Sequence, residues 1–261
     1  NKLALARIQE GIKKTSGILL VTGPTGSGKT TTLYSILTIL NQEDVNISTL
    51  EDPIEYEIKG INQSQVKPKI GFSFANGLRS MLRHDPDVMM VGEVRDIETA
   101  EIAIRVALTG HLVFSTLHTN DAAGAMTRLL DMGIEPYLVA SSVECVIAQR
   151  LVRLICPKCK RPVKEKKTVL DELGIKDIPK EGAAFEGKGC ESCKFTGYRG
   201  RTAIYEFLVL NEDIRQMILN RNSADQIKKK AIALGMRTLR GDGIEKVFKG
   251  LTTVSEVVRV T

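Results

Sequence analysis

The sequence of 261 residues is poor in several features that mark particular classes of protein. It contains no tryptophan and only 5% aromatic residues, so few rings are present to stack on nucleobases. It also lacks any segment near the roughly 20 consecutive apolar residues of a membrane-spanning helix, so we expect any membrane contact to be peripheral. Internal repeats and low-complexity tracts are missing as well. With 43% hydrophobic and 26% charged residues, the composition is typical of a globular protein.

The chain carries a formal net charge of +6. Clustered basic residues raise local affinity for phosphate, so nucleic acid, an anionic membrane or an acidic protein are all candidate partners. The basic residues concentrate in one stretch, where acids interrupt them and no aromatic residue lies beside them. They are Arg150, Arg153, Lys158, Lys160, Arg161, Lys164, Lys166 and Lys167. A solvated basic face is the preferred interpretation, and no nucleic acid is expected as a partner.

The first 150 residues alternate short β-rich runs with amphipathic helical patterns. Strands are predicted at residues 17–22, 47–50, 88–91 and 112–116, and a helix is predicted at 31–40. This alternation predicts an α/β fold with a mostly parallel sheet and helices on both of its faces. The first and third strands are almost wholly apolar, which is typical of central strands covered on both sides.

The regular pattern changes near Cys156, where paired cysteines, prolines and charged residues interrupt it. A helical period returns further along the chain. We therefore predict three parts: an α/β core at 1–150, a small cysteine module at 151–203 and a helical C-terminal subdomain at 204–261. Because the chain starts at Asn1 and enters a helical pattern at once, we also expect it to be a piece of a longer protein.

One segment matches the phosphate-binding pattern G-x-x-x-x-G-K-S/T, directly after the first predicted strand and directly before a predicted helix. Its residues are Gly23, Pro24, Thr25, Gly26, Ser27, Gly28, Lys29 and Thr30, followed by Thr31 in the helix. Glycines let the backbone curl into a concavity of inward N–H groups at the positive end of the helix. Lys29 would reach the β- and γ-phosphates, and the Thr30 hydroxyl would help to hold Mg²⁺. A glycine-rich structural turn is the alternative, which the strand and helix context disfavours.

Acidic residues follow two of the predicted strands, at the edge where ligands bind in open parallel sheets. Glu55 lies in the cluster at 51–55, and Glu93 lies in the cluster at 91–96. Hydrolysis needs a group that orients and deprotonates a water in line with the γ-phosphate, and Glu93 is our choice for that role. Solvated strand ends without a function are the alternative. His118 also ends an apolar strand, where an imidazole can sense the γ-phosphate or serve a purely structural role.

Four of the five cysteines form two C-x-x-C pairs. They are Cys156, Cys159, Cys190 and Cys193. Each pair places two thiolates on a tight knuckle, and two knuckles supply the four ligands of a structural Zn²⁺ site with no open position for water. Disulfides, free thiols and an iron–sulfur cluster are the alternatives, and a reducing compartment disfavours the disulfides. The fifth, Cys145, is predicted to be a small core residue in a helical run at 141–152.

Four motifs together resemble the secretion ATPases that power type II secretion and type IV pilus assembly. GPTGSGKTT at 23–31 resembles the family's Walker A motif, and ISTLEDPIEY at 47–56 resembles its Asp box. MMVGEVRD at 89–96 is similar to its Walker B motif, and STLHTN at 115–120 is similar to its His box. The resemblance covers almost the whole chain. It implies a RecA-like P-loop NTPase fold that binds ATP with Mg²⁺ and works as a hexameric ring.

The resemblance also implies roles for single residues. Glu93 would be the catalytic base, Glu55 would help with metal or water, and His118 would lie near the γ-phosphate. In the family a preceding domain supplies arginines to the phosphates, so a chain without it is expected to bind nucleotide less tightly and to hydrolyse it slowly. Assembly and export members carry the tetracysteine insert that retraction members typically lack, which favours the assembly or export direction.

The same resemblance implies an inner-membrane platform protein as partner and a cytoplasmic location peripheral to the inner membrane. Two other functions stay open. The first is a nucleic-acid translocating RecA-like ATPase, since Cys₄ modules and hexamers occur there too, and a strong salt-dependent affinity for DNA would favour it. The second is a nucleotide-gated scaffold without turnover, against which the presence of Glu93 argues.

Overall fold

The computed structural model describes residues 8, 10, 11, 13–163 and 184–261, so Lys164, Lys166 and Lys167 of the basic stretch lie outside the described residues. The chain packs as two compact units. Unit 1 comprises Asn1–Ala148 and Phe207–Met236, and unit 2 comprises Gln149–Glu206 and Arg237–Thr261. The C-terminal helices are therefore divided between the units, and the three-part division of the chain stays a prediction.

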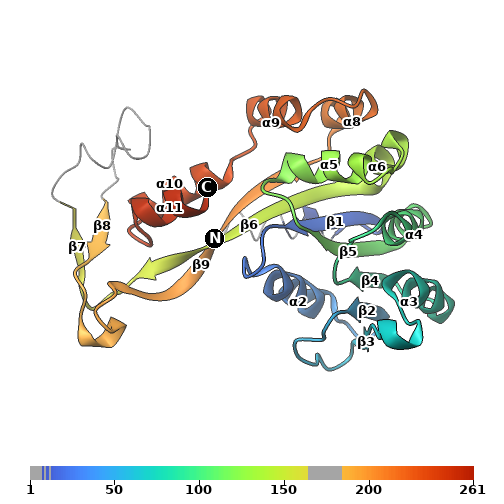
Figure 1. The fold of residues 1–261 in the computed structure, drawn as a ribbon, viewed down its shortest axis with the longest axis horizontal. Coiled ribbons are helices and arrows are strands. Elements are labelled where there is room, and N and C mark those ends of the chain that lie inside the picture. The colour runs from blue at the N-terminus through green and yellow to red at the C-terminus, as the bar shows by residue number, and fades with distance from the viewer. Residues whose placement is uncertain (1–7, 9, 12, 164–183) are drawn as a thin grey trace. The chain divides into compact units, whose positions relative to one another are not determined.

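Seven strands form one sheet in the order β3-β2-β4-β5-β1-β6-β9 (Figure 1). Their bounds are β1 Gly17–Thr22, β2 Ile47–Glu51, β3 Asn62–Gln65, β4 Val88–Val91, β5 Leu112–Leu117, β6 Val143–Ile155 and β9 Tyr198–Val209. Five of the pairings, from β3 through to β6, are parallel. The predicted α/β fold with a mostly parallel sheet is confirmed, and each of the four predicted strands is present with its bounds correct to within one residue.

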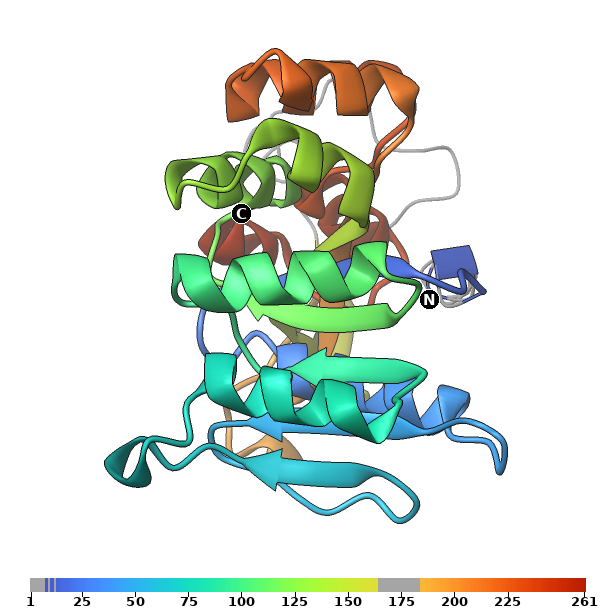
Figure 2. The same ribbon diagram turned by 90° about the vertical axis from the view of Figure 1, so that its right-hand side faces the viewer.

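Helices cover both faces of the sheet in unit 1. Helix α2 (Lys29–Leu40) lies on one face, and α3 (Phe74–Met81) and α4 (Ile97–Leu108) lie on the other (Figures 1 and 2). Strands β1 and β4 are buried along their whole length, as predicted from their apolar sequences. Within the described residues, no helix combines the length and the apolar character needed to cross a membrane.

The remaining helices come after β5 and after β9 in the chain. They are α5 Ala122–Asp131, α6 Pro136–Ser142, α8 Glu212–Leu219, α9 Ala224–Ala233, α10 Leu239–Phe248 and α11 Val254–Val260, with 3₁₀ turns at Pro68–Ile70, Leu82–His84 and Glu191–Cys193. Short strands β7 (Lys160–Pro162) and β8 (Phe185–Gly187) pair in antiparallel fashion in unit 2. Helices account for most of the residues from Glu212 onward, whereas residues 204–209 of the predicted helical subdomain belong to strand β9.

The predicted helix at 141–152 is wrong. Helix α6 ends at Ser142, and strand β6 begins at Val143. The β-branched residues Val143, Val146 and Ile147 are fully buried against β1, where both faces of the sheet are covered, and this packing outweighs the weak helical period. Cys145 pairs in register with Leu19 and is 6% exposed, so its predicted place in the core is confirmed.

Most helices begin at a side chain that accepts a hydrogen bond from a first-turn amide. The capping residues are Ser73, Asp96, Asp121, Asn211, Ser223, Thr238 and Thr253. Such caps satisfy amides that the helix itself leaves without a partner. Helix α2 differs, because it begins after Gly28 with no side-chain cap. No N-cap side chain therefore accepts a hydrogen bond from the first turn of α2.

Unit 2 holds its charged groups in internal pairs. Glu256 on α11 is 1% exposed and accepts hydrogen bonds from the Arg153 amide and guanidinium and from the Arg259 guanidinium, at 2.8–3.0 Å. Burial alone would raise the pKa of Glu256, but these hydrogen bonds outweigh it and lower the pKa to about 2. On α10, Asp242 forms a buried ion pair with Lys246.

Candidate functional site

The four predicted nucleotide motifs follow four strands that are neighbours in the sheet. In the order of the sheet, Glu55 follows β2, Glu93 follows β4, His118 follows β5 and the glycine-rich loop follows β1. Because these strands are parallel, their carboxyl ends lie at one edge. Ligands of open α/β sheets bind at that edge. The strand order thus gathers segments that are separated by up to about 95 residues in sequence.

The glycine-rich loop joins β1 to α2 in a conformation that only some residues tolerate. Gly26 has a φ of 78° and Gly28 a φ of 87°, in the left-handed region that favours glycine. Gly28 immediately precedes the uncapped first turn of α2. The Lys29 ammonium lies over the loop and donates to the carbonyls of Gly23 at 2.9 Å and Pro24 at 3.2 Å. The loop therefore places the start of a helix without a side-chain cap beside a cation, which suits an anion.

A cavity of about 560 Å³ opens beside this loop. Most of the predicted site residues line it: Thr25, Gly26, Gly28, Lys29, Thr30, Thr31, Glu55, Glu93 and His118. Gly23, Pro24 and Ser27 do not line it, since they form the back of the loop. The structure thus brings the cationic loop with its hydroxyl groups, the carboxylates of Glu55 and Glu93 and the imidazole of His118 to one cavity.

Glu93 lies between two basic side chains in the cavity. One carboxylate oxygen forms an ion pair with Arg95, and the other lies 3.6 Å from His118 Nε2. The Glu93 side chain is 14% exposed, whereas His118 is 49% exposed, so the carboxylate is fixed and the imidazole is open to a ligand. The hydrogen bond to Glu93 raises the pKa of Arg95. Arg95 lies in the segment at 89–96 that resembles the Walker B motif, but the sequence indicated no role for it.

The loops that carry the site are fastened to one another by a pair of threonines, which we call the Thr22–Thr119 clasp. Thr22 Oγ1 accepts the Thr119 amide at 2.9 Å, lies 2.7 Å from Thr119 Oγ1, and lies 3.0 Å from the Leu117 carbonyl. Thr22 precedes the glycine-rich loop, and Thr119 follows His118. The clasp therefore fixes His118 relative to the loop. Nothing in the sequence pattern indicated it, because the two threonines lie 97 residues apart.

A second network that the sequence analysis missed lies under the Glu55 loop. Tyr34 of α2 is fully buried, and its hydroxyl donates to the buried Glu51 carboxylate. Burial raises the pKa of Tyr34, and the hydrogen bond to Glu51 raises it further. The cluster at 51–55 thus contains two different kinds of acid: Glu51 and Glu55 both line the cavity, but Glu51 is buried in this network and Glu55 is exposed.

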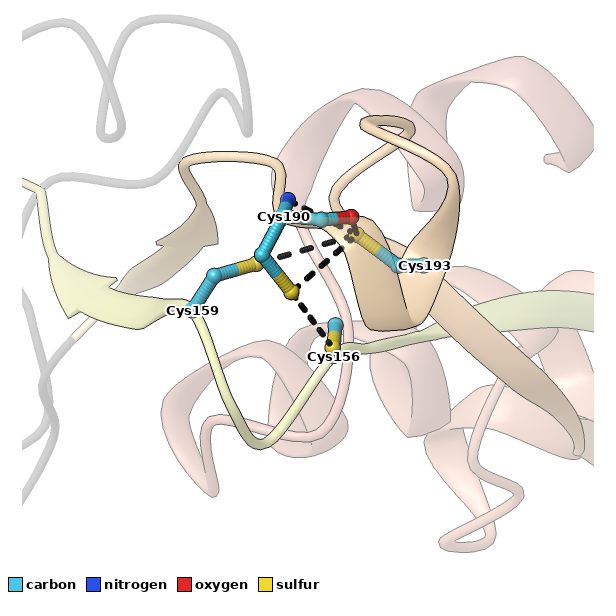
Figure 3. Close-up of side chains that lie close together, drawn as sticks. All are labelled: Cys156, Cys159, Cys190 and Cys193. Atoms are coloured by element: carbon cyan, nitrogen blue, oxygen red, sulfur yellow. Dashed lines mark hydrogen bonds between the residues drawn. The ribbon is translucent and has the colours of Figure 1, made fainter.

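The four predicted metal ligands come together in unit 2 (Figure 3). All four sulfur atoms lie within 4.8 Å of one another. Three of the sulfur pairs are 3.8–3.9 Å apart: Cys156 with Cys190, Cys159 with Cys193, and Cys190 with Cys193. A disulfide has a sulfur separation of about 2.05 Å, so these pairs are not bonded to each other. A tetrahedron with zinc–sulfur bonds of about 2.3 Å has edges of about 3.8 Å, which the cluster fits.

Backbone amides donate to two of the sulfurs, although burial outweighs this at Cys159 and raises the pKa of its thiol to about 11. The Gly189 amide donates to Cys159 Sγ at 3.3 Å, and the amides of Cys190 and Gly197 donate to Cys193 Sγ at 3.2 and 3.3 Å. Burial opposes ionisation, but for Cys193 these two amides outweigh burial and lower the pKa to about 6. The donor set and the amides around it therefore suit a thiophilic cation with four ligands.

Two glycines let the segments before and after the Cys190–Cys193 knuckle approach closely. A Cβ atom on Gly187 would lie 2.1 Å from the Gly197 carbonyl oxygen, and one on Gly197 would lie 2.5 Å from the Gly187 carbonyl oxygen. Both distances are far below van der Waals contact. Any larger residue at either position would force apart the two backbone segments that flank Cys190 and Cys193.

Comparisons with known proteins identify the family of the chain. A sequence model of the family described as "Type II/IV secretion system protein" matches residues 1–259. The chain belongs to this family. The type II secretion system protein E of Pseudomonas aeruginosa is 54% identical over 254 residues, which are 97% of this chain and 50% of that protein. The type IV pilus assembly ATPase PilB of Myxococcus xanthus is 51% identical over 260 residues, covering 97% of this chain and 45% of that protein.

Solved structures of the secretion family share the fold. The crystal structure of the pilus retraction motor PilT with bound ADP superposes with a TM-score of 0.73 at 32% identity, covering 98% of this chain and 64% of that one. This likeness confirms the predicted fold class. The chain spans about half the length of the curated relatives it matches, so the activity of the whole protein is a matter for proposal.

Proposed function

We propose that this chain is the ATP-hydrolysing motor domain of a machine for type II secretion or type IV pilus assembly. The observation that carries the proposal is the convergence of Lys29, Thr30, Glu93 and His118 on one cavity at the carboxyl edge of the sheet. That set supplies what phosphoryl transfer to water requires: a cradle for phosphates, a hydroxyl for Mg²⁺, a base and a group near the γ-phosphate.

Each residue would contribute by its position. The uncapped amides of α2 and the Lys29 ammonium would hold the β- and γ-phosphates. The Thr30 hydroxyl would hold Mg²⁺, which when bound neutralises charge on the phosphates. Glu93 would accept a proton from the attacking water, and Glu55 would orient that water or the metal from the opposite wall. His118, held by the Thr22–Thr119 clasp, would contact the γ-phosphate.

The tetracysteine cluster would hold a structural Zn²⁺. With four sulfur ligands, the ion has no open position for a reacting water, so its chemistry is cross-linking of the two knuckles. The separations of 3.8–3.9 Å between sulfurs support zinc over a disulfide arrangement. The cluster is also the reason for proposing the module at 151–203 as a domain of its own, between the core at 1–150 and the helical subdomain at 204–261.

Assembly or export is the proposed direction of work. The relatives near 50% identity are named for type II secretion and type IV pilus assembly, whereas the retraction motor is 32% identical. We further propose a hexameric ring, cytoplasmic and peripheral to the inner membrane, that acts on a platform protein of the machine. A nucleic-acid translocase is not favoured by any contact in the described residues.

The experiment measures ATP hydrolysis against protein concentration, together with zinc content, in the chain and in its Glu93→Gln variant. A rate that depends on Glu93 and rises faster than linearly supports a motor whose sites are completed between subunits. Bound nucleotide without turnover in the protein that includes its upstream region would contradict the proposal and favour the scaffold. Stimulation by DNA that weakens as salt rises would favour the translocase.

A further inference from the structure

The side chain of Tyr34 connects the helix of the glycine-rich loop to the loop that carries Glu55. It lies five residues after Lys29 on α2 and is fully buried. A buried phenol needs a hydrogen-bond partner, and Tyr34 finds one in the Glu51 carboxylate. The contact joins α2 to the end of β2.

The Glu51 carboxylate is saturated by donors. Besides Tyr34, the Thr49 hydroxyl donates to it at 2.6 Å and the Gln63 amide donates to it at 3.1 Å. Glu51 is only 2% exposed. A buried carboxylate is tolerated when hydrogen bonds replace its lost water, and three donors from three elements do so here. Glu51 is therefore held in one orientation and is not available as a base.

The same network reaches the loop at 52–56. The Glu55 amide donates to the Tyr34 hydroxyl at 3.3 Å, and the Gln63 side chain donates to the Tyr56 carbonyl at 3.2 Å. The Tyr56 ring meets the Tyr34 ring edge-on, with 4.7 Å between centroids. Asp52, Pro53, Glu55 and Tyr56 are all exposed, so the loop has little burial of its own to fix it. Its hold on the protein comes from this buried network.

We propose that Tyr34 and Glu51 form a positioning unit that sets the backbone of Glu55 relative to the phosphate-binding helix. The inference rests on the proposed function, because it assigns a purpose to the position of Glu55. Tyr34 is a positioning residue and touches no reacting atom. Displacement of a catalytic group by about 1 Å can lower turnover by about a hundredfold, so the loss of one anchoring hydroxyl is expected to be visible in the rate.

The first test is Tyr34→Phe in the full chain, with Tyr137→Phe as control. Phenylalanine keeps the ring that packs against Tyr56 and removes only the hydroxyl. Tyr137 is 60% exposed on α6 and loses the same atom without touching the cavity. We expect Tyr34→Phe to lower kcat about tenfold and to change the Kd for ATP less than about twofold. Tyr137→Phe is expected to match the parent. Equal kcat for the parent and Tyr34→Phe would overturn the proposal.

The second test asks whether Tyr34 acts through Glu55. In a Glu55→Ala background, Tyr34→Phe is expected to lower kcat by less than about twofold, because the group it positions is gone. The same tenfold loss in both backgrounds would show that Tyr34 acts elsewhere and would overturn the proposal. A rise in the Kd for ATP and a fall in thermal stability, with no separate fall in kcat, would reduce Tyr34 to a core residue.

The third test does not depend on activity. Hydrogen exchange of the Glu55 amide reports its bond to the Tyr34 hydroxyl directly, and we expect exchange to quicken about tenfold in Tyr34→Phe. The Gly92 amide, bonded to the Leu50 carbonyl, is the internal reference and should keep its rate. An unchanged Glu55 amide overturns the positioning unit. If exchange of the Glu55 amide quickens in Tyr34→Phe but the parent shows no Glu93-dependent hydrolysis, the positioning unit stands. That result would refute the proposed function alone.

Discussion

The two units of the chain use their charged and ionisable groups in opposite ways. In unit 1, Lys29, Glu55, Glu93 and His118 come from four different segments and line a cavity. In unit 2, the four thiols face one another, Glu256 is enclosed by two arginines, and Asp242 pairs with Lys246. The cavity of unit 1 keeps these polar groups available for a ligand, although Glu51, which also lines it, is paired internally, and the groups named in unit 2 are all paired with one another.

The difference shows how each kind of site is assembled and what it contributes to the protein. An open site depends on strand order to bring its residues together and stays accessible to substrate. A closed site depends on short local turns, and its groups stabilise the fold by partnering one another. The changes below remove one group from either side of this comparison, and they are ordered by the size of the expected effect.

Removing the base of the open site should have the largest effect. Glu93→Gln keeps the shape of the side chain but cannot accept a proton, so kcat for ATP hydrolysis should fall by about 10²–10⁴. The Kd for ATP should change by less than about fivefold, since the glycine-rich loop is intact. Phosphate release and nucleotide titration measure the two quantities. Glu98→Gln is the control, because Glu98 is 60% exposed, pairs with Arg79 and does not line the cavity. A retained rate in Glu93→Gln would remove Glu93 from the role of base.

Removing one thiol from the closed site should release the metal. Cys190 contacts two other sulfurs, so Cys190→Ser should lower zinc from about one per chain to a small fraction and make unit 2 sensitive to proteolysis. Total metal analysis and limited proteolysis are the measurements. Cys145→Ala is the control, because it also removes one thiol but lies in the core outside the cluster. Full zinc content in Cys190→Ser would refute the ligand set.

The pH dependence of stability tests the contribution of the buried Glu256 carboxylate in unit 2. Its lowered pKa means that it stabilises the fold fully above its unfolded pKa near 4.5 and progressively less as the pH falls toward 2. Glu256→Gln should therefore lower the free energy of unfolding by on the order of 3 kcal/mol at pH 7, with a difference that shrinks between pH 4.5 and 2. Denaturant titration at several pH values measures it.

Glu245→Gln provides the control for that titration. Glu245 also forms two ion pairs, with Arg237 and Lys249, but its side chain is 32% exposed. Exposed ion pairs contribute about 0–1 kcal/mol, so this variant should lose little stability at any pH. Equal losses in Glu245→Gln and Glu256→Gln would show that burial is not what distinguishes Glu256.

The Thr22–Thr119 clasp should give the smallest effect of the four. Thr22→Val has nearly the same shape but cannot accept the Thr119 amide, so His118 should lose its fixed position and kcat should fall about tenfold. Thr22→Ser retains the hydroxyl and should stay within about twofold of the parent. Steady-state hydrolysis distinguishes them. Similar rates for the valine and serine variants would mean that the clasp does not support His118.

Local patterns predicted the parts of both sites, and sheet order decided how they meet. The glycine-rich loop and the two cysteine pairs are contiguous motifs, so their residues were recognisable one segment at a time. Tyr34 and Thr22 were missed because their partners lie 17 to 97 residues away, and only the order β2-β4-β5-β1 makes them neighbours. Strand β6 was mistaken for a helix since Val143, Val146 and Ile147 are buried on both faces and show no alternation.

The caps of the helices have a consequence for selectivity among anions. Of the described α-helices with eight or more residues, α2 alone has a first turn that no side chain closes. At every other such helix, a free anion would have to displace a tethered oxygen that is always present at high local concentration. At α2 an anion does not have to displace a capping side chain. Among these helices, competition with a capping side chain therefore disfavours anion binding everywhere except at α2.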